Sequence, residues 1–120
     1  MKAVTLNKLV RKALIDCDST AAELAQSIGV SCSFVSMVLR GEKKMSDSML
    51  EKISAFFDSR GVKVEGLRVA ADVSNGKIPL DGLSKAHQYL VASLATMKLN
   101  QRDIDNLAAR LKQCTTHIKR

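Results

Sequence analysis

The side chains best suited to covalent or metal chemistry in this 120-residue chain are three cysteines and two histidines. Cys17, Cys32 and Cys114 lie far apart and form no CxxC pair, and neither His87 nor His117 stands near them at a metal-ligand spacing. No Ser/His/Asp grouping or phosphate-binding loop accompanies them. We therefore expect reduced thiols in a cytoplasmic protein, with no metal, no cofactor and no enzymatic activity.

A second set of side chains, within residues 31–44, suits hydrogen bonding rather than catalysis. A helix over residues 32–39 would turn Val35 and Val38 inwards. Its outer face would then carry Cys32, Ser33, Ser36 and Met37. A surface helix without a ligand more often carries Glu and Lys, which improve solubility. Short uncharged side chains instead allow close approach to base edges in the major groove of DNA.

Helical periodicity and capping residues predict the elements that would position this face. Apolar residues at helical spacing indicate helices over residues 5–16, 21–28, 32–39 and about 47–58. Thr20 and Glu23 form the T-x-x-E capping box that starts the second of these helices, because each side chain satisfies the other's backbone amide. Gly29 stands where a left-handed residue is needed to end it.

The segment TAAELAQSIGVSCSFVSMVLRGEKK, residues 20–44, resembles the helix-turn-helix of the Cro/CI-type, or lambda-repressor-like, DNA-binding family. The likeness extends over roughly residues 5–60. The agreeing residues are Glu23-Leu24-Ala25, Ile28-Gly29-Val30-Ser31, Ser36, and Arg40-Gly41 followed by basic residues. A small residue is needed at Ala25, where two helices cross, and Gly29 makes the tight turn between them. The alternative is a small helical bundle that binds no ligand.

The resemblance implies that the helix over 32–39 enters the major groove and reads bases with its N-terminal half. By position, the base contacts fall on Cys32, Ser33, Ser36 and Met37. Met37 would pack on a thymine methyl, or else serve as a partly buried filler. Phosphate contacts fall on Thr20, Ala21, Ser31, Arg40, Lys43 and Lys44. The implied partner is double-stranded DNA, with a palindromic operator.

Two positions depart from the family's pattern. Many members begin the second helix with a phosphate-binding Gln, where this chain has Ala21. Many also pair an Arg in the first helix with a Glu near the end of the third, where this chain has Leu14 and Leu39. We infer that an apolar contact replaces a buried ion pair, an exchange that often costs no stability.

The second half of the chain is more basic than the first and is harder to interpret. Residues 61–120 hold ten Lys and Arg against five Asp and Glu, whereas residues 1–60 hold nine against seven. Alternating apolar residues over 61–82, with Asn75-Gly76 as a turn, predict a short β-hairpin in this connecting segment. Gly66 and the Ala70-Ala71 pair leave a broken helix open.

The helical pattern returns from about residue 81 to 98 and from 101 to 116, and predicts a C-terminal helical hairpin within the region 83–120. We expect this hairpin to dimerise. The interface would contain Leu90, Val91, Leu94, Ile104, Leu107 and Leu111. Two alternatives are that it only completes the core of the monomer, or that it binds a second protein.

Taken together, the sequence predicts a mainly α fold with a DNA-binding domain at residues 1–60, a connecting segment at 61–82 and a helical dimerisation region at 83–120. The predicted function is a sequence-specific transcriptional regulator, a dimeric repressor of phage or mobile-element type. The alternative is the antitoxin of a toxin–antitoxin pair that binds its toxin through the C-terminal half. A net charge of +7 favours a polyanionic partner. No stretch approaches the roughly 18 apolar residues of a membrane span, so we expect no membrane partner.

Overall fold

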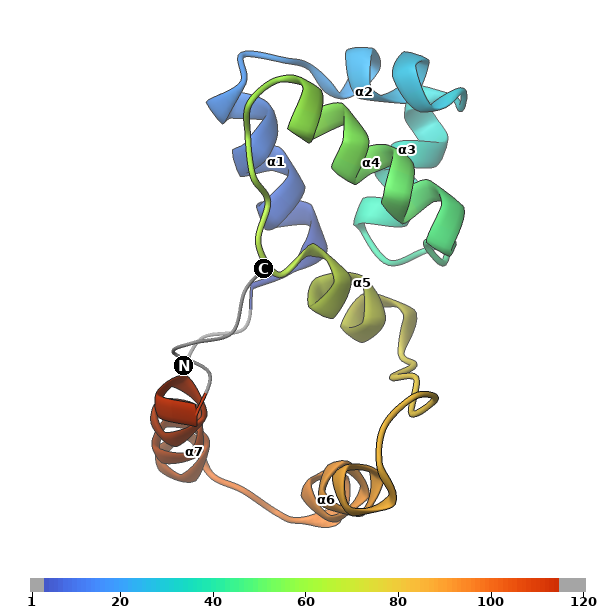
Figure 1. The fold of residues 1–120 in the computed structure, drawn as a ribbon. Helices are drawn as coiled ribbons and strands as arrows, with labels where there is room; N and C mark the ends of the chain where they lie inside the picture. Colours follow the sequence, from blue (N-terminus) through green and yellow to red (C-terminus); the bar gives the residue numbers. More distant parts are fainter. Residues whose placement is uncertain (1–3, 115–120) are drawn as a thin grey trace. The chain divides into compact units, whose positions relative to one another are not determined.

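The computed structural model describes residues 4–114, which contain seven α-helices and no β-strand (Figure 1). The helices are α1 (Leu6–Asp16), α2 (Ala21–Ile28), α3 (Cys32–Leu39), α4 (Asp47–Ser59), α5 (Leu67–Asn75), α6 (Lys85–Thr96) and α7 (Gln101–Cys114). The chain divides into two compact units, residues 4–78 and a second unit that begins at Pro79. The prediction of a mainly α fold is confirmed.

Side-chain caps start each of the first four helices, and the cap at Thr20 is the one that the sequence predicts above. The hydroxyl groups of Thr5, Thr20, Ser31 and Ser46 each accept a hydrogen bond from the backbone N–H three residues later. The capping box of α2 is complete, since the Glu23 N–H donates to Thr20 Oγ1 at 3.1 Å and the Thr20 N–H donates to Glu23 Oε1 at 2.8 Å. Gly29 ends α2 in the left-handed conformation, with φ at +81°.

The core of residues 4–78 is apolar throughout. Its most deeply buried large side chains are Phe57, Leu24, Ile53, Val10, Val35 and Val38. Helix α1 packs against α3 and α5, α2 packs against α3 and α4, and α4 packs against α5. Leu14 and Leu39, at the two positions that depart from the family's ion pair, lie in this same core with exposed fractions of 4% and 3%.

The hairpin prediction for residues 61–82 is wrong, and the helical alternative holds over 67–75. Leu67, Ala70 and Ala71 are all buried, and their spacing of three and four residues places them on one face of α5. Asn75-Gly76 ends this helix instead of turning a hairpin, because Gly76 adopts a left-handed C-cap with φ at +69°. The alternation of Val62, Val64 and Val69 favours a strand, but packing of the apolar face of α5 against α1 and α4 stabilises a helix instead.

The C-terminal unit contains the two expected helices without a core between them. Asn100 and Asp103 cap α7, since the Asp103 N–H donates to Asn100 Oδ1 at 2.8 Å. No residue of α6 or of the described α7 is buried, and α6 and α7 are not among the helix pairs that pack closely. The expected close-packed hairpin is therefore not seen within residues 79–114. The predicted helix ends at residues 115–116 lie outside the described part of the chain.

Candidate nucleic-acid interface

The turn between α2 and α3 sets the direction of α3. The backbone N–H groups of Gly29 and Val30 both donate to the Ala25 carbonyl oxygen, at 3.0 Å each. Ala25 is buried beneath this turn, and Val35 of α3 is fully buried as well. As a result, α2 and α3 meet at an angle of 105°. The small side chain of Ala25 and the left-handed Gly29 thus serve the two purposes that their positions in the sequence indicate.

The outer face of α3 is uncharged and is most exposed at its N-terminal end. Cys32 and Ser33 are exposed, whereas Ser36 and Met37 are half-buried. All four predicted base-contacting residues therefore share one helix, with its first turn more accessible than its second. The half-burial of Met37 agrees with its interpretation as a partial filler while leaving part of its side chain accessible.

Two of the predicted phosphate-contacting residues are the helix caps of α2 and α3. Thr20 and Ser31 are exposed, and each hydroxyl oxygen already accepts a backbone hydrogen bond, from Glu23 and Phe34 respectively. A hydroxyl that accepts in this way still has its own O–H to donate to a ligand oxygen. Ala21, where the family often has Gln, is half-buried and offers only its backbone N–H.

The loop over residues 40–46 carries the other three predicted phosphate-contacting residues, all of them exposed. Arg40 Nε donates to Glu42 Oε2 at 2.8 Å, so this arginine already has a carboxylate partner. The hydrogen bond and charge of Arg40 lower the pKa of the Glu42 carboxyl, and Glu42 raises the pKa of Arg40 in return. Lys43 and Lys44 form no ion pair with any residue of the described 4–114, and they are the freer cations.

Both ends of this loop are anchored. At its start, the Glu42 N–H donates to the Met37 carbonyl oxygen at 2.9 Å. At its end, the Met45 side chain is buried with an exposed fraction of 4%. Met45 N–H donates to Asn75 Oδ1, and Asn75 Nδ2 donates to the Met45 carbonyl oxygen, both at 2.9 Å. Sequence reasoning missed Asn75, because Asn75-Gly76 is also a strong hairpin-turn signal.

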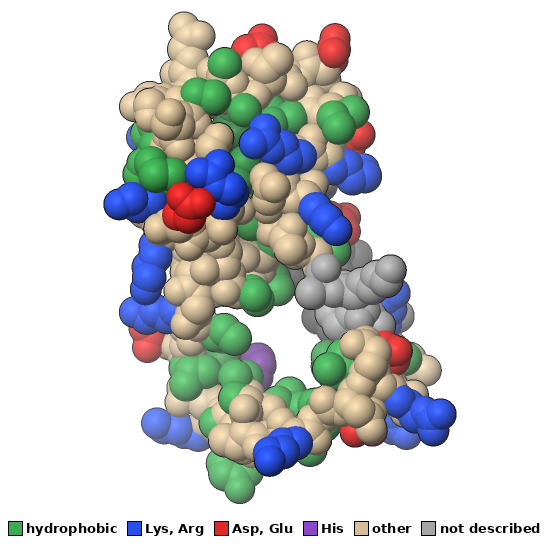
Figure 2. All heavy atoms as spheres, turned by 180° about the vertical axis from the view of Figure 1, so that it is seen from behind, with side chains coloured by type: hydrophobic (Ala, Val, Ile, Leu, Met, Phe, Trp, Pro, Cys, Tyr) green, Lys and Arg blue, Asp and Glu red, His purple; other side chains and the backbone are tan. Residues whose placement is uncertain are grey.

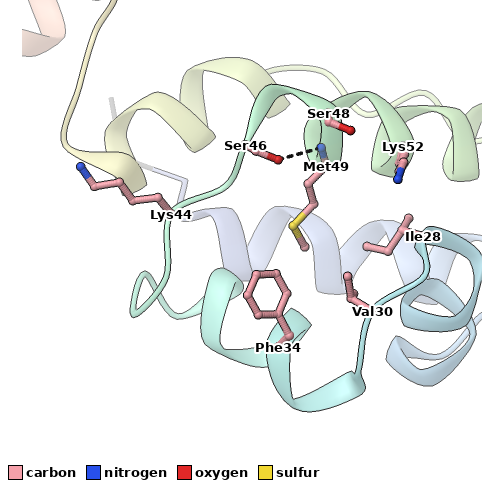
Figure 3. A pocket seen from close by; sticks show the side chains of 8 residues that line it. All are labelled: Ile28, Val30, Phe34, Lys44, Ser46, Ser48, Met49 and Lys52. Atoms are coloured by element: carbon pink, nitrogen blue, oxygen red, sulfur yellow. Dashed lines mark hydrogen bonds between the residues drawn. The ribbon is translucent and has the colours of Figure 1, made fainter.

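A cavity of about 210 Å³ lies between the α2–α3 turn and the start of α4 (Figure 3). Ile28, Val30, Phe34 and Met49 provide its apolar side chains. The Met49 side chain points from α4 towards the Phe34 ring, whereas the Lys44 side chain points away from these apolar groups. Ser46, Ser48 and Lys52 complete the lining. Lys44 and Ser46, the N-cap of α4, thus border the same cavity as Phe34 in the first turn of α3.

Positive charge is dispersed over the face of the molecule that Figure 2 shows. Figure 2 shows lysine and arginine side chains scattered across one face, with single Asp and Glu side chains between them. No three His, Cys, Asp or Glu side chains within the described residues group as metal ligands. Among the same residues no single helix has the length and apolar character to cross a bilayer, although the bent pair of α2 and α3 passes that test when taken together.

Comparisons of this chain with protein-family models, with curated proteins and with solved structures found no match.

Proposed function

We propose that this chain is a sequence-specific, double-stranded DNA-binding protein that regulates transcription as a homodimer, with α2 and α3 as its helix-turn-helix. The observation that carries the proposal is the exposed, uncharged first turn of α3, which α2 holds at 105° through a three-residue turn. DNA-binding helix-turn-helix units join two helices at about 90–120° through a short turn. The second helix of such a unit lies in the major groove.

The base contacts in this proposal come from the start of α3. Cys32 and Ser33 are the most exposed of the four candidates, and Ser36 and Met37 follow one turn later. A serine hydroxyl donates or accepts, so it can bond to several bases and discriminates between them only weakly. Specificity then depends on several weak contacts in each half-site.

Phosphate contacts supply most of the affinity in this proposal. Lys43 and Lys44 are exposed and free of ion pairs within residues 4–114, and Thr20 and Ser31 present hydroxyl groups at two helix N-termini. Helix N-termini and lysines both attract phosphate oxygens. Arg40 joins them only when it exchanges the Glu42 carboxylate for a phosphate.

The C-terminal unit supplies the dimer contact in this proposal. Leu90, Leu94, Leu107 and Leu111 have exposed fractions of 37–58%, and no residue of α6 or of described α7 is buried. Helices of 12 and 14 residues are marginal in water without tertiary packing. Pairing of two copies would bury these leucines, together with the half-buried Val91 and Ile104.

The same exposed apolar residues favour a second candidate, an antitoxin whose C-terminal half binds a toxin. The two candidates differ in what covers α6 and α7. A dimer of the pure protein in analytical ultracentrifugation supports the first candidate. A monomer that forms a stoichiometric complex with a small protein encoded beside it supports the second.

The test of DNA binding is selection from a random duplex library, followed by footprinting of the selected site at several salt concentrations. We expect a palindromic footprint and a linear fall of log K with log salt, with a slope of about −0.9 for each neutralised phosphate. Lys43→Ala should make this negative slope shallower by about 0.9 and leave the base preference unchanged. Lys63→Ala, an exposed lysine outside the proposed contacts, is the matched control. Binding without any sequence preference would overturn the proposal.

A further inference from the structure

Asn75 makes a contact that few other side chains could make. Its amide accepts from the N–H of Met45 and donates to the carbonyl oxygen of the same residue, both at 2.9 Å. The two residues are thirty positions apart in the chain. A side-chain amide offers a donor and an acceptor in one plane, a combination that Ser, Asp or Leu at this position would not reproduce. Asn75 therefore pairs with Met45 much as a neighbouring strand would.

The position of Asn75 is itself well determined. Leu67, Ala70 and Ala71 bury one face of α5 in the core of residues 4–78. On the outside of the same helix, Arg68 Nη1 donates to Asp47 Oδ1 at 2.8 Å, which ties α5 to the first turn of α4. Helix α5 is therefore a fixed support, and the amide at its last residue holds the end of the 40–46 loop.

Met45 directly follows Lys44, one of the proposed phosphate contacts, and directly precedes Ser46, the N-cap of α4. Lysine contacts phosphate as a point charge on a flexible stem, so the backbone position decides which phosphate it reaches. With the Met45 end released, the loop would have to be ordered during DNA binding, at a cost in conformational entropy.

We propose that Asn75 is a positioning residue for DNA binding, which fixes the end of the 40–46 loop so that Lys44 meets the phosphate backbone. The inference rests on the proposed function. It extends the DNA-binding unit to α5 and to a residue that itself contacts no DNA. Because phosphate contacts fix register without reading sequence, Asn75 acts on affinity and leaves base preference unchanged.

The experiment compares wild type with Asn75→Ala and Asn75→Leu, in binding to the selected operator and to an unrelated duplex. Loss of one phosphate contact should lower the binding constant about eightfold at 0.1 M salt. Each contact contributes a factor of the salt concentration raised to about −0.9, which is about 8 at 0.1 M. We expect both variants to lose about this factor on both duplexes, with a salt slope that is shallower by about 0.9. The ratio of operator to unrelated binding should not change.

A double-mutant cycle with Lys44→Ala separates positioning from a general loss of stability. If Asn75 acts through the lysine, the double variant should bind little worse than either single variant, because the second change removes a contact already lost. Thermal melts identify the temperatures at which every variant is folded. Hydrogen exchange at the Met45 amide should accelerate in Asn75→Leu, which reports directly on the released loop.

The outcomes are distinguishable. Wild-type protein that binds no DNA overturns the proposed function and this inference with it. Wild-type binding with unchanged affinity and salt slope in the folded Asn75 variants overturns the inference alone. Fully additive losses in the cycle would also overturn it, because they would show that Asn75 does not act through Lys44.

Discussion

Leu14→Arg tests whether an apolar contact stands where many Cro/CI-type proteins, which this sequence resembles, have a buried ion pair. Leu14 is 4% exposed on α1 and Leu39 is 3% exposed on α3, and these two helices pack together. An arginine at position 14 would be buried without a carboxylate, since the core contains no buried polar or charged side chain among the described residues. A buried charge without a partner costs about 3–5 kcal/mol.

That cost is large compared with the stability available. A unit of residues 4–78 should have a free energy of unfolding of roughly 4–11 kcal/mol, at about 0.05–0.15 kcal/mol per residue. A loss of about 3 kcal/mol should lower the melting temperature by at least about 12 °C, at roughly 4 °C per kcal/mol for a domain of this size. If the unit lies at the low end of this range, the variant should be close to its midpoint at about 37 °C; at the high end it should stay folded with a lowered melting temperature.

The assay is thermal and urea unfolding followed by circular dichroism. Ile15→Arg is the matched control, because Ile15 neighbours Leu14 on the same helix but is 77% exposed. Its effect should stay within about 0.5 kcal/mol. Leu14→Arg combined with Leu39→Glu should recover part of the loss, because the new charges become partners. Equal melting temperatures for Leu14→Arg and Ile15→Arg would refute the reasoning.

Three further predictions concern the 40–46 loop and the C-terminal unit. Glu42→Gln should raise DNA affinity by a few-fold in binding titrations, because it releases Arg40 and removes a negative charge, and unchanged or weaker binding would count against Arg40 as a phosphate contact. The Arg40–Glu42 pair should persist below the ordinary titration range of glutamate and be lost as pH falls through the lowered pKa of Glu42; in an NMR titration that pKa should rise in Arg40→Ala. Leu94→Asp should convert a dimer to a monomer in analytical ultracentrifugation and leave the melting of residues 4–78 unchanged, whereas a persistent dimer would exclude this face of α6 as the interface.

The features of the candidate site that could be predicted from the sequence are local ones. The capping box of Thr20 and Glu23, the left-handed Gly29 and the Ser31 cap each depend on residues within about four positions of one another. Such interactions are decided by backbone geometry and hydrogen bonding within one turn, so residue type and spacing are enough to predict them. They define α2 and α3 and place Cys32 and Ser33 on the exposed first turn of α3.

The role of residues 61–78 was decided only by the tertiary structure. Over this stretch the alternation of Val62 and Val64 and the Asn75-Gly76 turn signal are compatible with strands, and local sequence offers no basis for rejecting them. Burial of Leu67, Ala70 and Ala71 against α1 and α4 makes the segment a helix. The pairing of Asn75 with Met45 spans thirty residues, and a contact between such distant positions exists only once the helices between them have packed.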